Sequence, residues 1–161
     1  MPRTMNSPAK ASPRPAAATE ARVLDVLLAA LQTIGVVPAN WLTLAAVAEG
    51  IPGDPLPQPD KPRVYLQYLR TEPQGSEAGV GVHMWRIYCA VWVTATDVRT
   101  MLAAKADVVR AIFNAEGTIT TALTQPAYPG EFAYQNELSQ SGYAVGVLTV
   151  FVDMEIPHAA P

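Results

Sequence analysis

The chain has 161 residues, half of them apolar, and a formal net charge of −3. This length and apolar content are enough for one domain with a sizeable core, whereas two domains would each be marginal. The negative charge argues against binding to duplex nucleic acid, because proteins of that class neutralise phosphates with clustered Lys and Arg.

Residues 1–18 are rich in proline and in basic residues. This segment contains three of the 11 basic residues of the chain and none of its 14 acidic ones. Such a composition cannot bury enough apolar surface to order itself, so we expect a disordered arm. The arm either binds an acidic neighbour or is a solvated tail without a function, and the sequence leaves both open.

The first predicted helix runs from Thr19 to Ile34. Apolar residues recur on one side of this stretch, Thr19 is a suitable N-cap, and Gly35 is suited to end the helix. Beyond it, Trp41 to Glu49 is expected to form a short second helix, although an irregular apolar strap fits its periodicity equally well. Ile51 to Pro62 contains five prolines among its twelve residues. We expect a stiff, extended loop there.

Two predicted strands form a hairpin in the middle of the chain. Val64 to Leu69 alternates with apolar residues on both sides, and Val80 to Thr94 does so over a longer run. The glycine-rich stretch from Glu72 to Gly81 is expected to be the hairpin loop between them, with a mobile tip. The parity of the apolar residues changes between Met84 and Trp85, which predicts a β-bulge at that point.

The longer strand has two different faces. One face carries Ile87, Cys89 and Val91 and is typical of a core. The other face carries Tyr88 and Trp92 together with a charge, which is too apolar for water and too polar for the centre of a domain. Such a mixture favours contact with another protein.

A second long helix is predicted from Asp97 to Phe113, with Asp97, or Thr96 before it, as the N-cap. Lys105 falls in the middle of its apolar stripe. Either the stem of Lys105 lies along the core while its ammonium group reaches the edge, or the charge pairs across a subunit boundary. The residues that form this predicted stripe are Val98, Met101, Leu102, Val109 and Ile112.

The last third of the chain is expected to contain a long connection and a second hairpin. Glu116 to Gly130 is turn-rich, and a long connection without regular structure is usually functional or bound to a partner. Phe132 to Leu138 and Tyr143 to Ile156 alternate as strands, and Ser139 to Gly142 is expected to turn the chain between them. Both faces of the last strand are apolar.

These elements predict an α+β domain over residues 19–156, followed by a short tail at residues 157–161. Their order is helix, possible short helix, strand, strand, helix, strand, strand, which gives a four-stranded, mainly antiparallel sheet with two main helices on one face. The other face is then left uncovered, and we expect sister copies in an oligomer to bury it. The side chains expected at this subunit interface are Tyr88, Trp92, Val145, Val147, Phe151 and Lys105.

The sequence contains no motif that predicts catalysis, a metal site or a cofactor. His83 and His158 have no metal-ligand spacing to each other or to Cys89. Asp153 and Glu155 fit a surface pair better than a catalytic dyad, and no serine lies in a nucleophile elbow. The single cysteine allows no intramolecular disulfide. We therefore expect a protein that binds other proteins and is not an enzyme.

No apolar run approaches the roughly 18 residues of a membrane-spanning helix, and the N-terminus lacks the apolar core of a secretory signal. These features predict a soluble protein made in the cytoplasm.

Several stretches together define a layout that resembles a known family. They are an N-terminal helix (VLDVLLAALQTIG), a Pro-rich passage into a short strand (PRVYLQYL), a long strand (WRIYCAVWVTAT) followed at once by a helix (DVRTMLAAKADVVRAIF), and a closing apolar strand (GYAVGVLTVFVDMEI). Over about residues 20–156 this layout resembles the tail terminator proteins of long-tailed bacteriophages, to which head-to-tail neck proteins are related. The basic arm and the long last strand do not map onto that family.

The resemblance implies a virion protein, assembled in the host cytoplasm, that forms a hexameric ring on the head-proximal end of the tail tube. Such a ring stops polymerisation of the tail tube protein and offers a docking surface to the head connector or stopper protein. It implies no catalysis, no membrane and no specific contact with nucleic acid, although DNA passes through the ring. The loops expected to contact neighbouring rings contain Gln74, Gly75, Glu77, Tyr128 and Glu131.

Two other functions fit the same pattern. One is a different head-tail joining protein of the neck, which only its ring neighbours would distinguish. The other is a small α+β ligand-binding protein or enzyme with a pocket between sheet and helices. A stable monomer whose melting temperature rises with metabolites would favour the latter.

Overall fold

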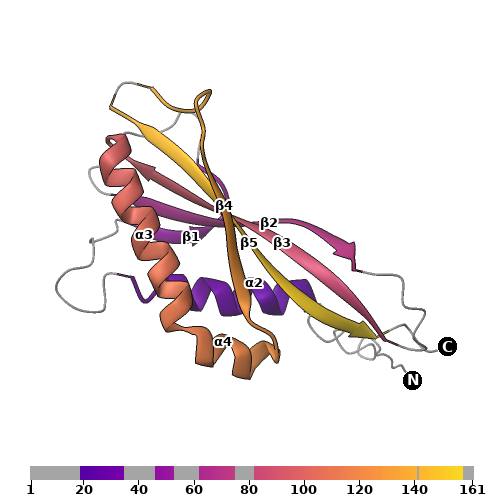
Figure 1. The fold of residues 1–161 in the computed structure, drawn as a ribbon. Helices are drawn as coiled ribbons and strands as arrows, with labels where there is room; N and C mark the ends of the chain where they lie inside the picture. The colour runs from indigo at the N-terminus through magenta and orange to yellow at the C-terminus, as the bar shows by residue number, and fades with distance from the viewer. Residues whose placement is uncertain (1–18, 35–45, 53–61, 75–81, 141, 158–161) are drawn as a thin grey trace, which may run out of the picture.

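The computed structural model describes residues 19–34, 46–52, 62–74, 82–140 and 142–157 (Figure 1). The predictions for the arm, for Gly35, for residues 158–161 and for most of the two loops before and after the first hairpin strand lie outside these residues. The described elements follow one another as α2 (Thr19–Leu31), β1 (Ala46–Glu49), β2 (Arg63–Pro73), β3 (Val82–Ala95), α3 (Val98–Asn114), α4 (Glu116–Leu123), β4 (Ala127–Tyr134) and β5 (Ala144–Pro157).

The strands form one five-stranded sheet in the order β1-β2-β3-β5-β4. β2 and β3 form the first predicted hairpin and β4 and β5 the second, and the two long strands β3 and β5 lie antiparallel in the centre. The strands cross one another at a marked angle in Figure 1, as the right-handed twist of sheets requires. The predicted α+β class and the two hairpins are confirmed.

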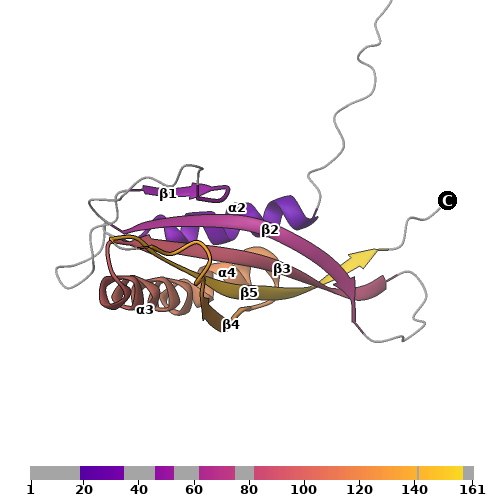
Figure 2. The same ribbon diagram turned by 90° about the horizontal axis from the view of Figure 1, so that it is seen from above.

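The helices pack on one face of this sheet. Figure 2 shows α2 and α4 behind the strands. The core between the layers takes Val23, Leu27 and Leu31 from α2, and alternate residues of the central strands such as Ile87 and Val150. This alternation arises because successive side chains of a strand point to opposite faces. The predicted helices that begin at Thr19 and after Asp97 are confirmed, and Asp97 caps α3 by accepting a hydrogen bond from the Thr100 backbone N at 2.8 Å.

Two parts of the predicted fold are wrong. Ala46–Glu49, expected at the end of a short helix, is a fifth strand that pairs in parallel with β2. The stretch expected as a long connection between Glu116 and Gly130 contains α4 and the first half of β4. Ile119 and Leu123 lie one helical turn apart and are both almost fully buried, so α4 is held by packing rather than by the helix propensity of its threonines.

The predicted β-bulge is also misplaced. β3 pairs with β5 without interruption from Val82 to Ala95, so no bulge lies at Met84 and Trp85. The register shifts instead in the two outer pairings, between Pro129 and Phe132 of β4 and between Tyr68 and Arg70 of β2. The shift in β2 leaves Leu69 without an opposite residue and puts Arg70 on the same face as Gln67.

Candidate interaction surfaces

Within the described part of the chain, no group of three or more His, Cys, Asp and Glu side chains is placed to hold a metal ion. Cys89 is fully buried, and burial raises the pKa of its thiol to about 12, which makes it a poor nucleophile at neutral pH. Among the described helices, none is long and apolar enough to cross a membrane.

The face of the sheet opposite the helices, called here the open face, carries aromatic side chains in cross-strand rows. In one row Tyr65 lies opposite Trp92, and Trp92 lies opposite Val147. All three side chains are half-buried. Nε1 of Trp92 donates a hydrogen bond to Oε1 of Gln67 at 2.9 Å, so this row offers apolar surface with its indole N–H already satisfied.

A second row of the open face runs through Arg70, Tyr88, Phe151 and Tyr128, which are paired across β2, β3, β5 and β4. The Arg70 guanidinium carbon lies 4.0 Å from the centre of the Tyr88 ring. The Phe151 ring centre is 6.1 Å from that of Tyr88 and 5.2 Å from that of Tyr128. The rings therefore form a continuous aromatic row across three strands, with a cation at one end.

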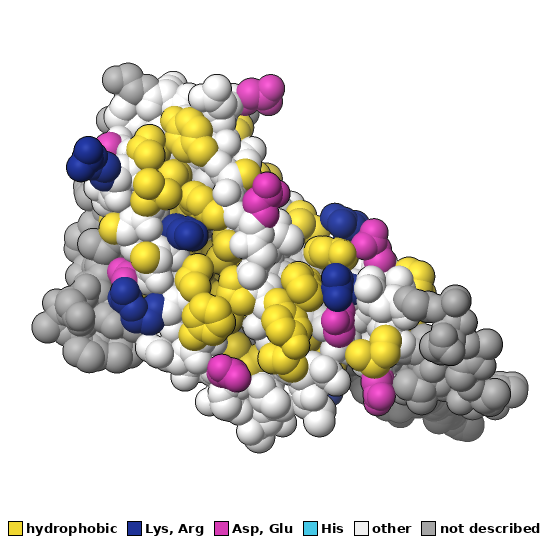
Figure 3. All heavy atoms as spheres, in the orientation of Figure 1, with side chains coloured by type: hydrophobic (Ala, Val, Ile, Leu, Met, Phe, Trp, Pro, Cys, Tyr) yellow, Lys and Arg dark blue, Asp and Glu magenta, His cyan; other side chains and the backbone are white. Residues whose placement is uncertain are grey.

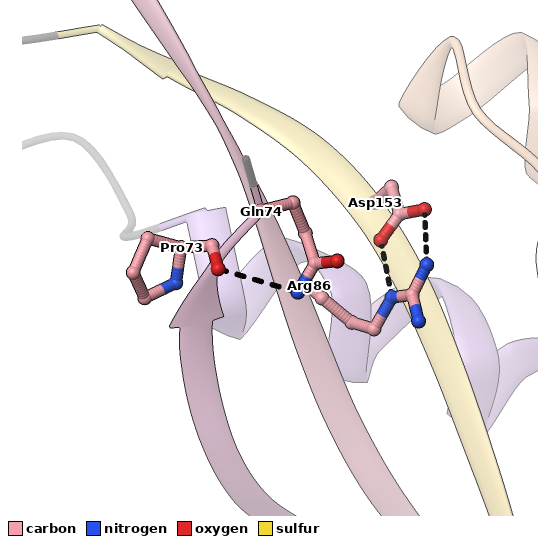
Figure 4. A network of polar contacts seen from close by, with 4 residues as sticks. All are labelled: Pro73, Gln74, Arg86 and Asp153. Carbon is pink, nitrogen blue, oxygen red and sulfur yellow. Dashed lines mark hydrogen bonds and ion pairs between the residues drawn. The ribbon is translucent and has the colours of Figure 1, made fainter. Parts of the chain in front are cut away.

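An ion pair fixes the next position along the open face (Figure 4). Arg86 donates from Nε and Nη2 to the two carboxylate oxygens of Asp153, at 2.8 and 3.1 Å. This hydrogen bonding raises the pKa of Arg86 above its ordinary value. The guanidinium carbon also lies 4.1 Å from the centre of the Phe151 ring, so the pair holds a flat cation against the aromatic row.

At the other end of the open face, near the start of β5, the side chains are buried. Val145 is fully buried, and Tyr143 is 1% exposed. Burial raises the pKa of the Tyr143 phenol. Val145 therefore adds nothing to the accessible part of this face, which consists of the rows that contain Trp92 and Phe151.

The outer side of α3 is a second apolar surface, called here the α3 stripe. It consists of Val98, Leu102, Lys105, Val109 and Phe113, whose spacing places them along one side of a helix. Val98 is 44%, Leu102 46% and Phe113 56% exposed. The predicted single stripe is therefore wrong, because it combined exposed Val98 and Leu102 with buried Met101 and Ile112. The residues of α3 that fill the core are Met101, Ala104, Val108, Ala111 and Ile112.

Lys105 lies in the middle of the α3 stripe, beside the edge strand β4. Its Nζ is 5.6 Å from the centre of the half-buried Phe132 ring. Lys105 forms no ion pair with any of the described residues. Figure 3 shows hydrophobic side chains gathered over α3 and β4, with basic and acidic side chains at separate points among them.

A groove of about 410 Å³ lies between α2 and α4 and is called here the α2–α4 groove. Its walls carry small side chains, including Ala29 of α2, Thr33 in the turn after α2, and Ala122 of α4. Asp25 is the one charged side chain among the described lining residues. Nη2 of Arg22 donates to the carbonyl oxygen of Ala122 at 2.7 Å and joins the two helices at one end of the groove.

Comparison with solved structures finds chains of similar fold. The fold is similar to a sheath/tube terminator. That protein belongs to an extracellular contractile injection system, PVC, and its structure was determined by cryo-EM in the extended state. The TM-score is 0.49 at 11% sequence identity, and the similarity covers 87% of this chain and 57% of that chain. This chain thus spans less than two thirds of that terminator. No family model and no curated protein matches the sequence.

The structure separates the residues predicted at the subunit interface. The accessible ones, Tyr88, Trp92, Val147 and Phe151, lie together on the open face. Lys105 lies apart from them, on the helix side of β4, where it adjoins Phe132.

The residues predicted to contact neighbouring rings are also spread out. Gln74 follows β2, where its backbone N donates to the Met84 carbonyl oxygen at 2.8 Å and its Nε2 to that of Pro73 at 3.4 Å (Figure 4). Tyr128 and Glu131 lie within strand β4, so the prediction that they belong to a loop is wrong. Gly75 and Glu77 lie outside the described residues.

Sequence reasoning missed the α2–α4 groove. The sequence places Asp25, Ala29 and Thr33 at intervals of four, on one side of the first helix. This signal was available, but its meaning depends on α4, which sequence reasoning replaced with a loop. Without α4 the small side chains of α2 have no opposite wall.

Proposed function

We propose that this chain is a structural virion protein that forms a ring on the head-proximal end of a phage tail tube. The ring ends polymerisation of the tube and provides the docking surface for the head connector or stopper protein. Six copies form the ring, and DNA passes through its centre. The order of helices and strands over about residues 20–156, which resembles that of tail terminators, supports this function.

The observation that carries the proposal is the open face of the sheet. Tyr88, Trp92 and Phe151 form rows of half-buried rings on a face that none of the described helices covers. Removing apolar area from water stabilises a contact by about 25 cal/mol per Å². In a closed ring, sister copies cover this face, and the hydrogen bond of Trp92 and the ion pair of Arg86 keep its side chains in place before contact.

The surfaces that remain would contact the rings above and below. Glu131 lies on the edge strand β4 and Gln74 directly after β2. Tyr128, which is 45% exposed, ends the aromatic row of the open face at this same edge strand. In the proposed ring these positions face the last ring of the tube or the neck, and no reaction is carried out by any of them.

The proposal is tested by letting purified tail tube protein of the same phage polymerise with and without this protein. We expect shorter tubes with a ring at one end in negative-stain electron micrographs. A head-tail joining protein of the neck would bind finished tails but leave tube length unchanged. Unchanged tube length would therefore contradict the terminator role, and so would a stable monomer that is stabilised by metabolites.

The role of the open face is tested by Trp92→Asp. We expect this variant to fold but to assemble less, because a carboxylate in the row of Tyr65 and Val147 must be desolvated on contact. Ile51→Asp is the matched control, since Ile51 is 55% exposed and lies outside the open face. Normal assembly of Trp92→Asp, measured by light scattering after size-exclusion chromatography, would show that sister copies do not cover this face.

A further inference from the structure

We infer that neighbouring copies in the ring are joined by the α3 stripe of one copy lying in the α2–α4 groove of the next, with Lys105 paired to Asp25 of the neighbour. This inference rests on the proposed ring and names the contact that closes it. The partner is a second copy of this chain, and three features of the described residues identify it.

The first feature is complementary charge. Lys105 is a cation within an apolar stripe and has no ion pair among the described residues. Asp25 is the one charged residue described in the lining of an apolar groove, and it has no hydrogen bond or ion pair within the described part of the chain. Each surface therefore carries one charge without an ion pair in the described part of its own subunit, and the two charges have opposite sign.

The second feature is complementary shape. The α3 stripe is a ridge, with Leu102 and Phe113 about half exposed. The groove is lined by small side chains such as Ala29 and Ala122, which let another helix approach closely.

The third feature is that the two surfaces differ. The ridge belongs to α3 and the groove to α2 and α4, so contact between copies is head-to-tail rather than symmetric. A head-to-tail contact that closes on itself generates a ring, as the proposed function requires. Lys105 is already positioned for such a contact by the Phe132 ring, which limits the freedom of its side chain before binding.

The charge pair is tested by exchanging the two charges in the full-length protein. Lys105→Glu and Asp25→Lys are each expected to weaken self-association by about tenfold or more, because each places like charges opposite one another. The double variant is expected to recover most of the association. Arg99→Glu and Glu137→Lys are the matched controls, since both residues are exposed and lie outside the two surfaces. Sedimentation velocity over a range of concentrations measures the association.

The head-to-tail geometry is tested by mixing two variants with one damaged surface each. Both variants are made in a Trp92→Asp background, which weakens contact through the open face. There Leu102→Glu damages the ridge and Ala29→Arg fills the groove, so each variant alone is expected to be monomeric. Mixed together, they are expected to form a 1:1 dimer, because the intact groove of the first accepts the intact ridge of the second. Light scattering would show the doubled mass, and thermal unfolding would show that both variants are folded.

The results separate this inference from the proposed function. A wild-type ring that is insensitive to the charge exchange, or a mixture that stays monomeric, would overturn the contact and leave the tube-capping role standing. A wild-type protein that does not associate at any concentration would also overturn the contact. Recovery in the double variant and in the mixture, without any effect on tube length, would support the contact and contradict the terminator role.

Discussion

Gly146 is the position in β5 where one added methyl group has the largest predicted effect. A Cβ at this residue would lie 2.3 Å from Cζ of Phe132 and 2.9 and 3.0 Å from its two Cε atoms. Carbon atoms in contact are normally about 3.5–4.0 Å apart, so the ring must move by more than an ångström. Gly146→Ala therefore forces Phe132 out of its place between β4 and α3.

The cost can be estimated from the two effects of this substitution. Inserting a methyl group into a filled site costs about 1–3 kcal/mol. Replacing glycine by alanine in a strand interior returns about 0.5–1 kcal/mol, because the unfolded chain loses freedom. In the wild-type background we expect a net loss of about 1–2 kcal/mol in the free energy of unfolding. In a Phe132→Ala background the clash is absent, and Gly146→Ala should be neutral or stabilising.

The coupling is measured by urea denaturation of the four proteins in this double-mutant cycle, with tryptophan fluorescence as the signal of unfolding. We expect a coupling free energy of about 2 kcal/mol between the two positions. Gly117→Ala is the control, because a Cβ at Gly117 in α4 meets nothing within 4 Å and is expected to stabilise the helix. A neutral Gly146→Ala with no coupling would mean that the Phe132 ring does not cover this glycine, and that Lys105 is held in some other way.

Three further substitutions test local features of the fold. Asp97→Ala is expected to lower the melting temperature at pH 7, because it removes the cap of α3. The hydrogen bond from the Thr100 backbone lowers the pKa of Asp97, so the difference between variant and wild type should be lost as the pH falls below about 4. Asp97→Asn should retain the cap without that pH dependence. Burial raises the pKa of Cys89 to about 12, so the free energy of unfolding should fall as the pH rises from about 8.5 towards that value. Cys89→Ala should remove this pH dependence. The thiol of the folded wild-type protein should resist alkylation. Thr124, with φ of 63°, holds a left-handed conformation at the end of α4, so Thr124→Gly should stabilise the protein by about 1 kcal/mol in chemical denaturation. Thr121→Gly within the helix should instead destabilise it by about 0.3 kcal/mol.

The parts of the fold that were predicted correctly are those whose sequence pattern is long. β3 and β5 each extend over 14 residues, and their alternation is typical of paired strands with one buried face. The capping side chain of Asp97 marks the start of α3 within the sequence itself. These signals are local and need no knowledge of which element packs where.

The parts that were missed depend on a partner elsewhere in the chain. β1 has only four residues, which is too short for a periodic signal, and it is a strand because β2 offers it a free edge. α4 has a glycine and several threonines, which favour other conformations, and it forms where Ile119 and Leu123 can be buried against the core. The bulge at Leu69 likewise belongs to the pairing of β2 with β3 and not to the strand that appeared irregular.

The candidate sites were predicted only in part because an apolar residue does not reveal whether its neighbour belongs to the same chain. α3 is apolar around so much of its circumference that several stripes can be drawn along it, and the predicted one combined buried Met101 with exposed Leu102. Lys105 is the residue that distinguishes the outward-facing stripe of α3 from the buried one. A charge is tolerated in the middle of an apolar stripe where the stripe faces outward, since burying it unpaired in the core would cost several kcal/mol. A lysine at helical spacing among apolar residues therefore favours a stripe that faces outward. In the contact inferred above, the residue opposite Lys105 is Asp25 of a second copy, which has no ion pair within the described part of its own chain.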